Sequence, residues 1–322
     1  MKTANKNIIH RGNSIISVET HPDYSHPVVI KKPAKRYPSR RSLRSLEKEY
    51  EMTRSLNAVE GVRKAMGQQS IENRQALILE YIDGETLRDH IGTKPLSLWA
   101  RLDLAIELAR ILREIHQQKV IHLDLNSKNI LVGKERGAVH FIDLGSASYI
   151  DRSGYQKVLP DQVLGTLSYI APEQTGRINR AVDERSDLYS LGAVLYELFT
   201  GQVPFDSKDP MTLVHNHIAR EPVAPAELSP EVPDVVSAII MKLLEKNAEQ
   251  RYQTAGGLAA DLQHCCALLR DSRQIELFPL GEEDIRDRLR IPDRLYRSEE
   301  HTSELQRRFD NGLRRFCLAV LK

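Results

Sequence analysis

The stretch His122-Leu123-Asp124-Leu125-Asn126-Ser127-Lys128-Asn129 decides how this 322-residue chain is interpreted. The carboxylate of Asp124 and the amide of Asn129 are five residues apart. A second carboxylate, in Asp143-Leu144-Gly145, follows fourteen residues after Asn129. Carboxylate and amide oxygens are ligands that Mg²⁺ prefers. A carboxylate can also accept a proton from a reacting hydroxyl. The stretch therefore offers oxygen ligands for a metal ion and a carboxylate that is able to accept a proton.

The sequence on either side predicts two parts of different structure. Upstream, short β-branched runs at 8–9, 15–18, 27–31 and 75–80 predict strands, and 42–56 predicts one charged helix. Downstream, apolar residues at helical spacing predict long helices, including one capped by Ser97, one ended by Gly201 and one capped by Asp209. We expect an α+β fold, with a small β-rich lobe, a larger helical lobe and a ligand cleft between them.

The bulk composition excludes several classes of protein. Basic residues number 46 against 44 acidic ones, so no strong field for nucleic acid or a membrane is expected. No apolar run approaches the roughly 18–20 residues that span a bilayer, and the N-terminus lacks the apolar segment of a signal peptide. Three cysteines without metal-ligand spacing favour reduced thiols. We expect a cytoplasmic protein that binds neither nucleic acid nor membranes.

In order and spacing, these segments resemble the signature set of protein kinases. The catalytic-loop pattern is followed by a metal-binding Asp-Leu-Gly, by Gly165-Thr166, by Ala171-Pro172-Glu173 and by Asp187 at the start of a leucine-rich helix. The resemblance runs from about residue 8 to about residue 270. Residues 165–205 and 278–296 resemble more specifically the N-terminal Ser/Thr kinase domain of large bacterial multidomain sensor kinases. Those proteins continue into AAA-type, GAF and histidine kinase modules.

The resemblance implies ATP and Mg²⁺ as cofactors and a protein as the phosphoryl acceptor. Asp124 would be the base that accepts the hydroxyl proton, while Asn129 and Asp143 would hold Mg²⁺. Lys31, in the run Val28–Lys31, would bind the α- and β-phosphates and form an ion pair with Glu49 on the helix predicted over 42–56. On the helical side, Glu173 with Arg251, and Asp187 under the catalytic loop, would act as scaffold.

The nucleotide's other contacts are expected in the first lobe. Leu79 resembles the residue that guards the adenine pocket, and the backbone of Glu80 and Ile82 would meet the adenine edge. The loop over the phosphates should be glycine-rich, yet His10–Ser17 offers only Gly12. A loop with fewer glycines approaches phosphates less closely, so we expect weaker nucleotide binding.

Two further departures affect the catalytic loop. Leu123 stands where many kinases carry arginine, so it offers no cation to a phosphate in the segment 146–168. Asn126 stands where Ser/Thr kinases carry lysine. Because tyrosine kinases place a cation at the equivalent of Lys128, we predict that Lys128 acts on the γ-phosphate instead; the alternative is an ordinary solvated lysine.

These departures leave two other functions open. A pseudokinase would bind nucleotide or a partner as a scaffold, although such proteins usually lose at least one of Lys31, Glu49, Asp124, Asn129 and Asp143, all of which are present. A small-molecule kinase of the same fold is disfavoured, because those enzymes normally lack the segments Gly165-Thr166 and Ala171-Pro172-Glu173.

The predicted domain boundaries follow from the same patterns. We expect a kinase domain over 1–272, with a first lobe to about 82 and a second lobe over 83–272. Residues 273–296 would form a linker toward a downstream ATPase domain. From Arg297 the chain reads RSEEHTSELQ, which resembles the translation of a common sequencing-library adapter, so 297–322 are expected to be a foreign tail.

Overall fold

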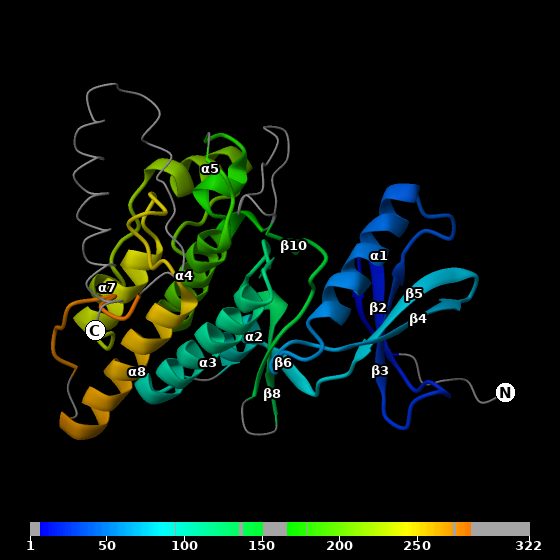
Figure 1. Ribbon diagram of the computed structural model, residues 1–322, viewed down its shortest axis with the longest axis horizontal. Helices are drawn as coiled ribbons and strands as arrows, with labels where there is room; N and C mark the ends of the chain where they lie inside the picture. The colour runs from blue at the N-terminus through cyan, green and yellow to red at the C-terminus, as the bar shows by residue number, and fades with distance from the viewer. Residues whose placement is uncertain are drawn as a thin grey trace, which may run out of the picture. The chain divides into compact units, whose positions relative to one another are not determined.

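The computed structural model describes residues 7–93, 95–134, 138–150, 166–178, 180–272 and 275–284. All of them belong to one compact unit that ends at Ile285. The predicted α+β class is confirmed, because a sheet-rich lobe is followed by a helical lobe (Figure 1). Gly165 and the expected foreign tail lie outside the described residues.

The first lobe is built on a five-stranded antiparallel sheet, in which the strand order is β1-β2-β3-β5-β4. In the register of the central strand β3, Lys31 lies opposite Ile16 on one side and Leu77 on the other. Alternation then sends Lys32 to the other face, as predicted, where its ammonium bonds Glu72 at 2.7 Å. The strands are β1 (Asn7–Arg11), β2 (Ser14–Glu19), β3 (Val28–Pro33), β4 (Ala65–Ile71) and β5 (Arg74–Glu80).

Helix α1 (Arg40–Ser55) packs on this sheet, beside β4 and β5 (Figure 1). It begins where the Ser39 hydroxyl accepts a hydrogen bond from the Ser42 N–H, which satisfies one of the free donors of the first turn. Its buried side chains come at helical spacing and include one carboxylate, Glu49, among Leu46, Met52 and Thr53. A charged group on the buried face of a helix needs a partner, and this places Glu49 toward the site described below.

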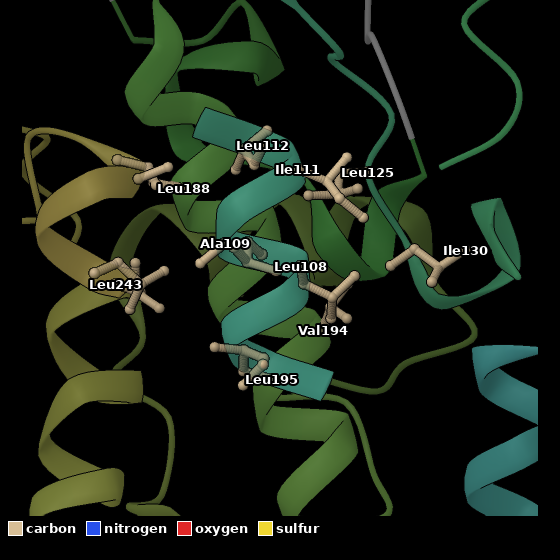
Figure 2. Close-up of a cluster of buried hydrophobic side chains, with 14 of the residues drawn as sticks. Leu108, Ala109, Ile111, Leu112, Leu125, Ile130, Leu188, Val194, Leu195 and Leu243 are labelled. Carbon is tan, nitrogen blue, oxygen red and sulfur yellow. The ribbon is translucent and has the colours of Figure 1, made fainter. Parts of the chain in front are cut away.

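The second lobe packs around helix α3 (Leu98–Gln117). Its residues Leu108, Ala109, Ile111 and Leu112 lie against side chains of neighbouring elements, among them Val194 and Leu195 (Figure 2).

In the described part of the chain no helix is long and apolar enough to cross a membrane. The elements are β6 (Gly84–Thr86), α2 (Leu87–Thr93), α3 (Leu98–Gln117), β7 (Val120–Ile121), η1 (Ser127–Asn129), β8 (Ile130–Gly133), β9 (Val139–Phe141), β10 (Ser148–Tyr149), η2 (Leu167–Tyr169), η3 (Pro172–Thr175), α4 (Glu184–Thr200), α5 (Pro210–Ala219), α6 (Pro225–Leu228), α7 (Asp234–Leu243) and α8 (Ala255–Ser272).

Residues 275–284, which the sequence pattern assigns to a linker, pack on the second lobe. Ile275, Phe278 and Leu280 contact its core, and the Phe278 ring stacks on His264 with 4.4 Å between centroids. The Asp284 carboxylate accepts hydrogen bonds from the Thr254 N–H at 2.9 Å and the Thr254 hydroxyl at 2.8 Å. The folded unit therefore extends about ten residues beyond the end of α8.

Candidate active site

A buried carboxylate at the start of α4 accepts hydrogen bonds from the backbone of the catalytic loop, residues 122–129. Asp187 accepts hydrogen bonds from the backbone N–H groups of His122 (2.8 Å) and Leu123 (2.9 Å). The His116 Nε2 lies 2.9 Å from the same carboxylate. These bonds fix Leu123 in the left-handed region, at φ 66°, a conformation that is costly for leucine. Asp187 is thus the scaffold residue that the sequence predicts.

The predicted base, Asp124, is oriented by side chains from two segments. Its Oδ1 accepts hydrogen bonds from the Thr166 N–H and hydroxyl, both at 2.8 Å, and from Asn126 Nδ2 at 3.2 Å. Its Oδ2 accepts one long bond, from Asn129 Nδ2 at 3.3 Å. Asn126 also donates to the Thr166 hydroxyl at 3.2 Å. One oxygen of the carboxylate is therefore held firmly, and the other is the more available acceptor.

Lys31 joins the two lobes through two carboxylates. Its ammonium lies 2.7 Å from Glu49 Oε1 and 3.1 Å from Asp143 Oδ2. Lys31 and Glu49 are nearly buried, whereas Asp143 keeps about 40% of its side chain exposed. The predicted ion pair between β3 and α1 is therefore formed, and it reaches the predicted metal ligand as well.

Electrostatics keep this lysine charged. Burial lowers the pKa of Lys31, but Glu49 and Asp143 outweigh it, so that the pKa is raised overall. For Asp143, burial favours the protonated form, and the Lys31 ammonium outweighs that effect, so that the pKa of the carboxyl is lowered. A cation beside an ionised carboxylate is a suitable environment for phosphates and a divalent ion.

The residues predicted to bind Mg²⁺ fit that role. Asp143 sits at φ 62°, so the sharp turn falls on the aspartate rather than on Gly145. A Cβ on Gly145 would come within 3.2 Å of Asp143 Oδ1 and 3.4 Å of Glu49 Oε2, so glycine leaves room between them. Asn129 uses its Nδ2 to bond Asp124, and its Oδ1 accepts no hydrogen bond from the described residues. Two hard oxygen ligands are thus available.

The strand β5 leads into the predicted adenine contacts. Leu79 is buried in the apolar cluster of the first lobe. The Glu80 N–H donates a hydrogen bond to the Lys64 carbonyl at 3.0 Å. By contrast, the Ile82 N–H bonds to no other described residue, which leaves a donor for the edge of a base.

Gly12 lies in the turn between β1 and β2, and Lys128 lies in the catalytic loop, as the sequence predicts. Neither residue makes a contact that shows a role in binding phosphates. Gly12 sits in the tight β1–β2 turn, where its N–H bonds the Ser14 carbonyl at 3.0 Å, and a Cβ there would meet His10 at 2.7 Å. Lys128 follows Ser127 in the short helix η1, and its side chain is exposed and bonds to no described residue. Their predicted parts in binding phosphates stay predictions.

The second predicted scaffold pair is present and extensive. Arg251 donates to both oxygens of Glu173, at 2.7 and 2.9 Å, and also to the carbonyls of Glu245 and Arg185. The Ser186 hydroxyl completes the set at 2.8 Å from Glu173. Because every polar atom of this buried pair is occupied, it fixes the segment after η2 to the late helices.

Two residues that belong to the site were not given a role there from the sequence. Asn126, treated there as a missing lysine, bridges Asp124 and Thr166. Arg63 is buried, and burial lowers its pKa to about 10 against the opposing effect of Asp143, Glu80 and Glu49. A lone arginine between a helix and a strand carries no sequence signal for such a position. The structure alone brings it to these carboxylates.

Comparison with known proteins agrees with this geometry. Residues 9–263 match the family model described as Protein kinase domain. Serine/threonine-protein kinase PknB of Mycolicibacterium smegmatis is 36% identical over 187 residues, which cover 58% of this chain and 29% of that protein. A probable serine/threonine-protein kinase of Clostridium perfringens is 37% identical over 188 residues, covering 58% and 27%. The chain thus matches less than a third of these relatives' length.

Proposed function

Since this chain belongs to the protein kinase family, we propose that it transfers the γ-phosphoryl group of ATP to serine or threonine of a protein substrate. The matched region contains Lys31, Glu49, Asp124, Asn129 and Asp143, the residues on which that chemistry would depend. The serine/threonine preference rests on the names of the similar proteins and on Thr166 beside Asp124.

The single observation that carries the proposal is the position of Lys31 between Glu49 and Asp143. Phosphoryl transfer asks a protein mainly to position groups and to neutralise charge. A lysine that is already paired with the helix carboxylate, at 2.7 Å, is held where it can bind phosphate oxygens. A resting form with this pair broken would have to rebuild the site first.

The chain's own residues divide the work as follows. Asp143 and the Oδ1 of Asn129, which accepts no hydrogen bond from the described residues, would hold Mg²⁺, which supplies charge neutralisation on the phosphates when bound. The Ile82 N–H would orient the adenine edge, and Lys31 would fix the α- and β-phosphates. Asp124 accepts the proton of the substrate hydroxyl at Oδ2, because Oδ1 is occupied by Thr166 and Asn126.

The test is transfer of labelled phosphate from Mg-ATP to a generic basic protein by the purified chain. We expect transfer, and we expect Asp124→Asn and Asp143→Asn each to lower the rate by orders of magnitude while the melting temperature stays within a few degrees. Undiminished transfer by both variants would overturn the assignment.

A pseudokinase scaffold is the second candidate. It is favoured by the three donors that already occupy Asp124 Oδ1, and by the single glycine of the β1–β2 turn. Nucleotide binding by the wild-type chain, measured by a thermal shift with Mg-ATP, together with no transfer to any of a panel of proteins, would favour this scaffold over the enzyme.

The larger context remains part of the proposal. We infer a bacterial signalling protein in the cytoplasm, of which this domain is the N-terminal module and whose downstream domains are its partners, on the resemblance of residues 278–296 to the linker of multidomain sensor kinases. Residues from about Arg297 onward would be foreign to it. Sequencing an independently amplified gene across this junction is the direct test.

A further inference from the structure

The buried arginine Arg63 takes no part in the chemistry proposed above. It lies just before β4, and only 9% of the residue is accessible to solvent. Its guanidinium forms no hydrogen bond or ion pair with any described residue, and its Nε is among the buried atoms that lack a partner there. A buried charge without a direct partner costs stability. A residue kept at such a cost calls for a functional explanation.

The backbone ties Arg63 to the segment that carries a predicted metal ligand. The Arg63 N–H donates a hydrogen bond to the Phe141 carbonyl at 3.0 Å, two residues before Asp143. Exposure alternates from here into β4, because Arg63 and Ala65 are buried whereas Lys64 is exposed. Ala65 belongs to the apolar cluster that joins the sheet to α1. The Arg63 side chain therefore points into the first lobe and not toward solvent.

Three carboxylates act on the charge of Arg63, namely those of Asp143, Glu80 and Glu49. Burial lowers the pKa of Arg63 to about 10 despite them, so the guanidinium stays protonated at neutral pH. Glu80 is partly exposed, so water solvates part of its charge. Asp143 and Glu49 are the two carboxylates that share the Lys31 ammonium. The charge of Arg63 is therefore felt at the Lys31 site.

Without Arg63, the Lys31 site would carry an excess of negative charge. One ammonium is shared by the carboxylates of Glu49 and Asp143, and both Lys31 and Glu49 are nearly buried. An excess of negative charge in the interior would repel the phosphates of a nucleotide. Arg63 brings the sum of these four side chains to zero. Because it bonds to neither carboxylate, it leaves their oxygens to Lys31 and to a metal ion.

We propose that Arg63 is a positioning residue of the kinase site, which acts through Lys31, Glu49 and Asp143 and sets the balance between metal binding and phosphate binding. The inference rests on the proposed function. A cation at this position opposes the binding of a divalent ion at Asp143 and favours the binding of a polyphosphate at Lys31. An exposed arginine would have little effect of either kind, because water and salt would screen its charge.

Three variants of the full chain separate the charge of Arg63 from its volume. Arg63→Met removes the charge and keeps most of the volume, whereas Arg63→Lys keeps the charge. Lys64→Met is the matched control, because it removes the same charge from the exposed neighbouring residue. The fluorescence of an ADP that carries a small fluorophore on its ribose reports binding without turnover, first in EDTA and then in a titration with Mn²⁺ in place of Mg²⁺.

The two measurements should shift in opposite directions in Arg63→Met. Binding of ADP in EDTA should weaken about tenfold, as expected for a unit charge that acts over several ångström at an effective dielectric constant of about 20. The Mn²⁺ concentration that half-saturates the ADP complex should fall, because the opposing cation is gone. Arg63→Lys and Lys64→Met should resemble the wild type in both measurements. The melting temperature of Arg63→Met should not fall, because an apolar side chain of similar size removes the cost of burying a charge.

Opposite shifts are a result that a merely structural residue would not give, since a distorted site loses affinity for both ligands. Weaker binding of both ligands in Arg63→Met, no change in either, or failure of this variant to fold would overturn the inference. An Arg63→Lys chain that behaves as Arg63→Met does would also contradict it. A wild-type chain that binds no ADP, with or without Mn²⁺, would overturn the proposed function and the inference with it. Opposite shifts in a stable variant support the inference, even if the chain transfers no phosphate.

Discussion

At the scale of single residues, Thr166 is the clearest determinant of how Asp124 is oriented. It gives the Asp124 carboxylate both its N–H and its hydroxyl. A hydrogen bond to a charged group contributes about 1.5–3 kcal/mol. Removing the hydroxyl should therefore lower kcat by about 10- to 100-fold if the bond orients the base in the transition state.

The prediction is that Thr166→Val lowers kcat by that amount with little change in KM for ATP, whereas Thr166→Ser retains most of the rate. Steady-state kinetics with labelled ATP measure both. A serine variant as slow as the valine variant would show that the methyl group, not the hydroxyl, is what matters.

Lys128 offers a second test at this scale. Its side chain is exposed, bonds to no described residue and comes just before Asn129 in the catalytic loop. If it acts on the transferred group, Lys128→Ala should lower kcat by about tenfold or more and leave nucleotide affinity unchanged, because the charge is felt most in the transition state. Lys128→Arg keeps the charge and is the control. An alanine variant with the wild-type rate would make Lys128 an ordinary surface lysine.

His217 on α5 predicts a pH dependence of stability. It is fully buried, its Nδ1 lies 2.9 Å from the Tyr189 hydroxyl, and burial, aided by Lys246, lowers its pKa to about 3. The unfolded chain would titrate near 6.5, so between these values it binds more protons than the folded state. His217 thus stabilises the fold fully above pH 6.5, and that contribution is lost as the pH falls toward 3.

The expected slope from this residue approaches about 1.4 kcal/mol for each pH unit between 6 and 4. Urea denaturation at several pH values measures it. His217→Gln, which keeps a polar group but does not titrate, should show a shallower fall of the unfolding free energy over that range. Parallel curves for the two proteins would contradict the assignment.

At this scale, the sequence predicts contacts that strand alternation and helical spacing determine, and it does not predict contacts between residues that are far apart in the chain. The Lys31–Glu49 pair follows from the alternation of a strand and the buried face of a helix. The bridge from Asn126 to Thr166 spans 40 residues, and no local pattern encodes it. The positive φ of Leu123 is likewise imposed by Asp187, which lies far along the chain.

At the scale of elements, the residues that cap helices predicted several helix ends correctly. Ser97, Asp209 and Gly201 lie where the sequence predicts the ends of α3, α5 and α4. Strand β4 was not predicted, because Ala65–Ile71 has neither alternation nor a β-branched run, and it forms by pairing with β5. Tertiary pairing there overrides a weak local preference.

The start of α8 depends on a residue about thirty positions downstream. Asp284 accepts hydrogen bonds from the N–H groups of Gln253 and Thr254 and from the Thr254 hydroxyl. We predict that Asp284→Ala lowers the unfolding free energy by about 1–2 kcal/mol, as loss of a helix cap does. Chemical denaturation measures this, with the exposed neighbour Glu283→Ala as the control. Equal effects of the two substitutions would exclude a specific cap.

At the scale of the whole molecule, the compact unit ends later than the family match does. The match with the kinase family stops at 263, and the sequence pattern places the domain end at 272, yet the compact unit runs to Ile285. The reason is apolar burial: Ile275, Phe278 and Leu280 pack on the core of the second lobe. The apolar residues of this segment, Ile275, Leu277, Phe278 and Leu280, are interrupted by Pro279 and show no helical period, so the sequence alone indicates a linker.

Two truncations test this boundary. A chain that ends at Ile285 retains the Asp284 cap and the three apolar contacts, whereas one that ends at Ser272 loses them all. We predict that the shorter chain unfolds with a free energy lower by about 2–4 kcal/mol, the sum of partial apolar burial and a lost cap. Urea denaturation of the two chains side by side measures the difference. Phosphoryl transfer at low temperature should be similar in both, because none of the described residues among those removed contacts Lys31, Asp124 or Asp143. If the two chains are equally stable, residues 275–284 are a linker after all.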